Sequence, residues 1–161
     1  MIHGILWSIF LIALTVTFFT DYYYLLIHRA ATIYIIPLFL VGAFLCATPC
    51  NLLEALLGFF VGYGFLWCFK TFYLWRRNID GIGQGDLELL ATIGSFLGPM
   101  GVLYTITYGS IIGTIIAVIM LLTKRAHAQT QLPFGSFLVL GCFIYIVPML
   151  NNCPWLKNLL S

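Results

Sequence analysis

The chain has 161 residues, of which 62% are hydrophobic and only 7% are charged, and its mean hydropathy is +1.06. A soluble domain carries about 25% charged residues, so this composition excludes a soluble globular protein and indicates an integral membrane protein. The formal net charge of +2 is too small to indicate a nucleic-acid partner, which leaves the lipid bilayer as the partner that composition predicts.

Uncharged apolar stretches predict the helices, and at about 20 residues per span the chain accommodates one transmembrane domain, residues 1–161, of about six helices. The first covers residues 4–20 and runs into Asp21, the second covers 33–49, and the third runs from 52 to about 75. Asn51, followed three residues later by Glu54, indicates a capping box at the start of the third helix.

The fourth predicted helix, residues 87–98, is too short to cross a bilayer. Its 12 residues cover about 18 Å at 1.5 Å each, against a hydrocarbon core of about 30 Å. The sequence GPMG at 98–101 interrupts it, and residues 102–123 and 136–150 form the fifth and sixth helices.

Glycines spaced by four, such as Gly58 and Gly62, indicate that helix backbones approach closely in lipid.

Basic residues gather in loops on one side of this arrangement. With the N-terminus outside, the loops at 21–32, 76–86 and 124–133 lie on one side and hold most of the arginines and lysines. The positive-inside rule makes these loops cytoplasmic, which predicts a multi-pass membrane protein.

The cysteines do not indicate a metal site. The five of them form no CxxC pair and no cluster with histidine, so we expect neither a metal nor another cofactor. Cys46 and Cys50 are spaced for a small disulfide, but isolated cysteines in apolar helices more often pack as small hydrophobic residues.

Two of the five acidic residues lie where predicted helices meet the cytoplasmic edge. Asp21 ends the first helix and Asp86 begins the fourth, so the topology brings them to the same edge of the membrane. A carboxylate at bilayer depth is costly and is normally paired or functional. The residues alone leave open a catalytic pair, ion or substrate transport, and a simple helix cap at Asp86.

Glycines precede the second of these acids. Gly83 and Gly85 flank Gln84 directly before Asp86, and residues without a Cβ let an extended peptide lie close to the backbone. This neighbourhood suits a catalytic carboxylate that must contact a peptide, although four residues alone are a weak signal.

The surrounding sequence is more specific. RRNIDGIGQGDLELLATIGSFLG at 76–98 resembles the second active-site segment of type IV prepilin peptidases, the GxGD family of membrane aspartic proteases, with its pattern G-x-G-x-G-D-x-K-L-L-A-x-x-G-x-x-x-G. TDYYYLLIHRAAT at 20–32 resembles the segment of the family's first aspartate. QLPFGSFLVLG at 131–141 resembles its closing motif L-P-F-G-P-F-L.

This resemblance implies an all-α, polytopic membrane aspartic endopeptidase. It would remove the leader peptide of prepilin-like precursors, such as pilins and pseudopilins, at the cytoplasmic membrane face. The resemblance implies a catalytic pair, Asp21 and Asp86, and nearby substrate-binding residues Gly83, Gly85, Pro133, Phe134 and Gly135. The pair would act on one water molecule and titrate as a unit, without a metal.

Departures from the family pattern leave alternatives open. Glu88 stands where the family commonly has lysine, and both Glu88 and Asp80 are other candidates for the acid pair. The zinc-binding CxxC domain of longer members is not found in this sequence, so we expect a short form in which N-methyl transfer is undecided. A small transporter or channel, or a non-catalytic factor that binds prepilins, are the other hypotheses.

Overall fold

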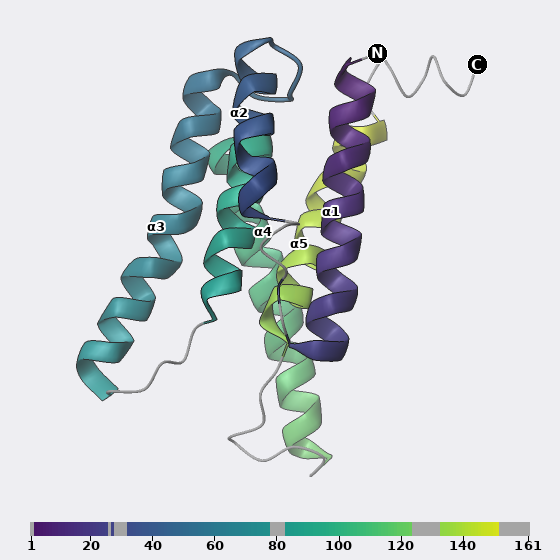
Figure 1. Ribbon diagram of the computed structural model, residues 1–161. Helices are drawn as coiled ribbons and strands as arrows, with labels where there is room; N and C mark the ends of the chain where they lie inside the picture. Colours follow the sequence, from purple (N-terminus) through teal and green to yellow (C-terminus); the bar gives the residue numbers. More distant parts are fainter. Residues whose placement is uncertain (1, 26, 28–31, 78–82, 124–132, 152–161) are drawn as a thin grey trace.

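The computed structural model describes residues 2–25, 27, 32–77, 83–123 and 133–151, and within these ranges it contains helices and no strand. The elements are α1 (Ile2–Tyr24), the 3-10 turn η2 (Ile33–Ile35), α2 (Ile36–Phe44), α3 (Leu52–Arg77), α4 (Gln84–Leu122) and α5 (Phe134–Asn151) (Figure 1). In this part of the chain α1, α3 and α4 are long and apolar enough to cross a membrane, and the remaining helices are shorter and also apolar. The chain is therefore an all-α polytopic membrane protein, as its composition predicted.

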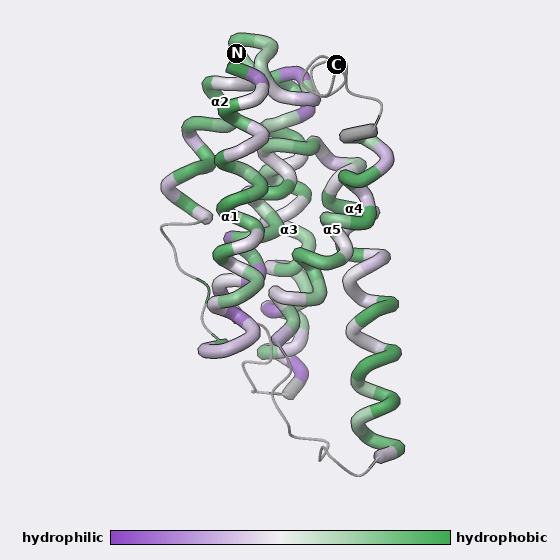
Figure 2. Tube along the Cα trace, turned by 90° about the vertical axis from the view of Figure 1, so that its right-hand side faces the viewer, coloured by the Kyte–Doolittle hydropathy of each residue, from purple (hydrophilic) through white to green (hydrophobic). Residues whose placement is uncertain are grey.

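Large hydrophobic side chains cover the outside of the bundle. Trp75 and Leu122 are each 79% exposed and Phe44 is 70% exposed. The most strongly hydrophilic residues lie mainly toward the two ends of the molecule (Figure 2). An apolar surface of this extent requires a lipid environment rather than water.

Helix α4 reverses direction at Gly98. This glycine has φ +74° and ψ −177°, which is open essentially only to glycine, and Pro99 lacks the N–H group that would continue the helix. Both ends of α4 lie at the same end of the bundle in Figure 1, and Asp86 and Ser110, equally far from Gly98 in sequence, line one pocket. The break predicted at GPMG is thus confirmed, and the short first half begins at Gln84, three residues earlier than predicted.

The second predicted helix, residues 33–49, was too long. α2 ends at Phe44 because Cys46 adopts a left-handed conformation, with φ +52°. The Cys46 N–H group donates to the Ala43 carbonyl, and the next N–H group donates to the Gly42 carbonyl. These two bonds form a Schellman motif, which satisfies carbonyl groups at the helix end.

The start of α3 has the predicted cap. The Asn51 N–H group donates to Glu54 Oε2 at 3.1 Å, which is the glutamate half of a capping box. Glu54 is exposed at the start of α3, at the end of the bundle opposite the C-terminal ends of α1 and α3 (Figure 1).

Glycines let α3 and the first half of α4 touch backbone to backbone. A Cβ atom at Gly58 would overlap the carbonyl oxygen of Gly94, and one at Gly94 would overlap that of Gly58. Gly62 lies against the Leu90 carbonyl in the same way. The predicted role of these glycines in close packing is confirmed, and this packing holds the start of α4 against α3.

Gly58→Ala should therefore destabilise the bundle. The added methyl group meets backbone rather than a movable side chain, so we expect a loss of about 1–3 kcal/mol in the free energy of unfolding, typical of overpacking. Gly64→Ala, on the same helix, is the matched control because no atom lies within 4 Å of its Cβ position. Thermal unfolding in detergent measures both, and equal midpoints for the two variants would contradict the prediction.

Aromatic rings from three helices pack together in the core of the bundle. Phe10 of α1 stacks on Phe96 of α4 with ring centroids 4.2 Å apart, and Phe39 of α2 lies 4.7 Å from Phe96. All three side chains are fully buried. This cluster fixes α1 relative to α4, the two helices that carry the acids.

Candidate active site

Helix α1 places Asp21 inside the bundle. Buried residues on α1 recur at three- and four-residue spacing through Phe10, Leu14, Thr17 and Asp21, so the acid continues the stripe that faces the core. Its side chain is only 5% exposed. An acid on the apolar face of a membrane helix needs polar partners from other elements.

Helix α4 places Asp86 in its own first turn. Gly83 is the N-cap residue, and the Asp86 N–H group donates to its carbonyl at 3.3 Å. The Asp86 side chain is 8% exposed, although the chain before it is at the surface, where Gly83 and Gln84 are exposed. The N-terminus of α4 offsets the negative charge of a carboxylate in this position.

Gly135, at the start of α5, lies between the two acids. A Cβ atom on this residue would be 3.0 Å from Asp21 Oδ2 and 3.0 Å from Asp86 Oδ1. The two carboxyl oxygens are therefore at most about 6 Å apart. The structure thus brings together two acids that are remote in sequence, at the end of the bundle where α1 ends and α4 and α5 begin (Figure 1).

Ser136, the next residue on α5, binds one of the two acids. Its N–H group donates to Asp21 Oδ2, and its hydroxyl group is 2.9 Å from the same oxygen. The hydroxyl group also lies 3.3 Å from the Phe18 carbonyl oxygen. Asp21 therefore caps the N-terminus of a helix other than its own, a position from which the α5 dipole favours negative charge.

The remaining predicted substrate-binding residues lie at the starts of α4 and α5, close in sequence to the two residues, Asp86 and Gly135, that these helices contribute to this site. A Cβ atom on Gly83 would lie 3.4 Å from Asp86 Oδ2, which is an ordinary contact. Gly85 packs directly on Ile27, which also contacts the Gly135 position. Pro133 and Phe134 are half-buried at the start of α5.

Of the other acids considered for the pair from the sequence, only Glu88 lies within the described residues, and it is not among the nearest neighbours of the Gly135 Cβ position. Glu88 is buried on α4 and lies two residues beyond Asp86, a separation that turns a helical side chain to a different face. Asp80 lies outside the described residues.

The cysteines Cys46, Cys50, Cys68 and Cys142 are free thiols, and Cys153 lies outside the described residues. Nowhere in the described ranges do three or more His, Cys, Asp or Glu side chains form a group that could hold a metal ion.

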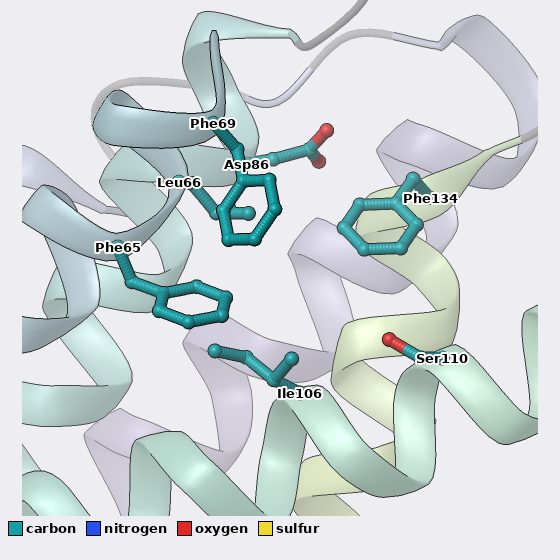
Figure 3. A pocket seen from close by; sticks show the side chains of 7 residues that line it. All are labelled: Phe65, Leu66, Phe69, Asp86, Ile106, Ser110 and Phe134. Carbon is teal, nitrogen blue, oxygen red and sulfur yellow. The ribbon is translucent and has the colours of Figure 1, made fainter. Parts of the chain in front are cut away.

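An apolar pocket of about 510 Å³ adjoins Asp86. Its lining comes from α3, both halves of α4 and the start of α5, and consists of Phe65, Leu66, Phe69, Asp86, Ile106, Ser110 and Phe134. Figure 3 shows Phe65 and Phe69 on one side of the pocket, Phe134 on the other, and the Asp86 carboxyl group at one edge. The site thus combines two acids with an apolar surface, as many binding sites do.

Two features of the site were missed by sequence reasoning. The pocket residues Phe65, Phe69 and Ile106 look like ordinary apolar helix residues, because their convergence depends on the reversal of α4. Ser136 had a signal, since it occupies the position of the second proline in the motif L-P-F-G-P-F-L. Proline has neither an N–H nor a hydroxyl group, so a proline there could not form the contacts that Ser136 makes with Asp21.

Comparison with known proteins identifies the family of the chain. Residues 8–118, which include both acids, match the type IV leader peptidase family. Proteins named prepilin leader peptidase/N-methyltransferase are similar to the chain. The one from Burkholderia pseudomallei is 35% identical over 97 residues, which cover 60% of this chain and 31% of that protein. The one from Pseudomonas aeruginosa is 35% identical over 96 residues, covering 58% and 32%.

The matched stretch makes up about a third of the length of these curated relatives. No solved structure gives a significant match to the chain. The family match nevertheless extends over well more than half of the sequence, from within α1 to the second half of α4. The chain therefore belongs to the type IV leader peptidase family.

Proposed function

We propose that this protein is an aspartic endopeptidase that removes the leader peptide of prepilin-like precursors, with Asp21 and Asp86 as its catalytic pair. The observation that carries the proposal is the meeting of these two buried acids at Gly135, each with an oxygen 3.0 Å from the position of a Cβ atom. Family membership and the names of the relatives support peptide-bond cleavage of prepilin leaders.

Two neighbouring carboxyl groups are suited to this hydrolysis. Like charges held close together cannot both ionise cheaply, so the pair shares one proton between them. The ionised member accepts a proton from water, and the protonated member polarises the scissile carbonyl group. The pair then titrates as a unit in the pH dependence of the rate.

The pocket beside Asp86 suits the hydrophobic segment that follows the leader. Its lining is mainly apolar, and Phe65 and Phe69 are 38% and 54% exposed on the outer surface of α3. A precursor helix that already lies in the bilayer could reach the acids laterally over these side chains. Gly83 and Gly85, at the surface-exposed start of α4, are the proposed contacts for the extended peptide.

The proposed location is the cytoplasmic face of the cell inner membrane. Asp21, the start of α4 and the start of α5 lie at one end of the bundle (Figure 1), and α3 ends there with Arg76 and Arg77. The positive-inside rule assigns that end to the cytoplasm.

The test is a cleavage assay with purified protein in lipid or detergent. A prepilin-like peptide with a basic leader and a hydrophobic helix should be cut once, before the helix, and mass spectrometry of the products identifies the bond. Cleavage should persist in the presence of a chelator because the two carboxyl groups supply the acid and the base. Intact substrate after prolonged incubation with the wild type would refute the proposed activity.

Phe69→Ala should weaken substrate binding. Loss of one aromatic wall of the pocket removes apolar contact made equally in the ground and transition states, so KM should rise about tenfold with little change in kcat. Phe72→Ala is the matched control, since Phe72 is an exposed residue of α3 that does not line the pocket. Equal KM values for the two variants would show that the substrate does not use this pocket.

A further inference from the structure

The two acids differ in what they contact. Asp21 Oδ2 receives the Ser136 N–H group and lies 2.9 Å from its hydroxyl oxygen, both inside the bundle. Ser136 is the third residue of α5, so its N–H group has no acceptor within its own helix. The carboxyl group from α1 therefore completes the N-terminus of α5, and the serine is 1% exposed.

Within the described part of the chain, Asp86 has no donors comparable to those from Ser136. Across the described ranges of the chain, the hydrogen bonds include none to its carboxyl group. Both acids lie at a helix N-terminus, Asp86 at α4 and Asp21 at α5, so the helix dipoles favour charge on both. The direct donors from Ser136 are thus what distinguishes the two sites.

We infer that Ser136 determines which acid of the pair acts as the base. It holds Asp21 as the ionised base and leaves Asp86 as the protonated acid. This inference rests on the aspartic peptidase activity proposed above. Hydrogen bonds donated to a carboxyl oxygen favour its charged form, whereas a buried carboxyl group without donors favours its neutral form. Ser136 acts through Asp21 and is a positioning residue.

The assignment gives each proton a place in the reaction. The water oxygen bonds to the scissile carbonyl carbon while Asp21 takes a water proton and Asp86 gives its proton to the carbonyl oxygen. Asp21 then passes its proton to the leaving nitrogen as the C–N bond breaks. Asp86 recovers a proton from one hydroxyl group of the intermediate, which becomes the new carboxyl carbonyl, and both acids return to their starting states.

The surroundings of Asp21 allow the effect of the Ser136 contacts to be measured separately from that of neighbouring charges. Among the described residues, Asp86 on α4 is the titratable group that faces Asp21 across Gly135. From α5 the contact is Ser136, which does not titrate. The neighbouring tyrosines of α1, residues 22–24, are all exposed. Altering Ser136 therefore changes the donors to Asp21 without removing another charge from the site.

The experiment compares the pH dependence of kcat in Ser136→Ala, Ser136→Thr and Ser136→Pro. Without its donors Asp21 stays protonated to higher pH, so the acidic limb of the profile should move upward. We expect a shift of about half a pH unit for alanine, which loses the hydroxyl group, and about one unit for proline, which also loses the N–H group. Threonine keeps both donors and should reproduce the wild-type profile. Proline is sterically acceptable in the first turn of a helix.

Ser8→Ala is the matched control, because Ser8 is an exposed residue of α1 whose hydroxyl group donates to the Gly4 carbonyl. Alanine and proline profiles that coincide with the wild type, or that fall uniformly without a shifted limb, would overturn the assignment. If the proline variant does not fold, the comparison of alanine with threonine decides alone. Failure of the wild type to cleave, or cleavage by Asp21→Asn, would instead refute the proposed function.

Discussion

Asp21→Asn and Asp86→Asn are each expected to abolish cleavage of a prepilin-like peptide while the bundle stays folded. An amide oxygen can still accept the hydrogen bonds that Ser136 donates to residue 21. An amide cannot take up or give the proton that hydrolysis requires. General acid–base groups contribute about 10²–10⁴ in rate, so we expect kcat to fall by roughly 10³ or more in each variant.

Stability should move in the opposite direction to activity. Each substitution replaces one of two acids that lie at most about 6 Å apart inside the bundle by a neutral amide, so the folded bundle no longer has to accommodate two ionisable acids close together. The thermal unfolding midpoint should stay unchanged or rise, a pattern typical of functional residues. Glu54→Gln is the matched control, because this exposed acid lies at the other end of α3 and the amide keeps an acceptor for the Asn51 N–H group.

The assay reports kcat from the rate at which the product peptide appears. A rate within tenfold of the wild type in either asparagine variant would remove that residue from the catalytic pair. Binding of the precursor without cleavage, by the wild type and both variants alike, would favour the non-catalytic assembly factor.

Gly135→Ala should reduce kcat by about two orders of magnitude or more. The new methyl group would lie 3.0 Å from an oxygen of each acid and 2.8 Å from Ile27 Cδ1. The acids or α5 must shift to accommodate it, and displacements of about 1 Å at a catalytic centre cost rates on the order of 10²-fold. Exclusion of water from the space between the carboxyl groups adds to the loss.

Helix propensity makes this substitution informative. Alanine is favoured over glycine inside a helix by about 1 kcal/mol, so a loss of activity cannot come from a weakened α5. Gly64→Ala supplies the control for a glycine-to-alanine change at an open position. Wild-type turnover by Gly135→Ala would show that the chemistry does not occur between these two carboxyl groups.

Local features of the fold followed from the sequence. The low charge content predicted a membrane protein, and the apolar stretches predicted its helices to within a few residues in most cases. Gly98 and Pro99 determined the reversal of α4, because one adopts a conformation open essentially only to glycine and the other cannot donate to a preceding carbonyl group. Glu54 predicted the cap of α3 in the same way. The end of α2 was predicted wrongly, because the left-handed position of its Schellman motif is occupied by Cys46, at φ +52°, and not by glycine, the residue that usually marks such a helix end.

The candidate site was predictable only in part. The motif around Asp86 and the position of Asp21 predicted a pair of acids at one membrane edge, and the structure places them on either side of Gly135. Capping, turns and helix periodicity depend on neighbours a few residues apart, so the sequence by itself determined them. The unequal contacts of the two acids and the apolar pocket were decided only by the tertiary structure. They require α1, α3, both halves of α4 and the start of α5 to pack together, and close packing sets distances between residues that no local pattern relates.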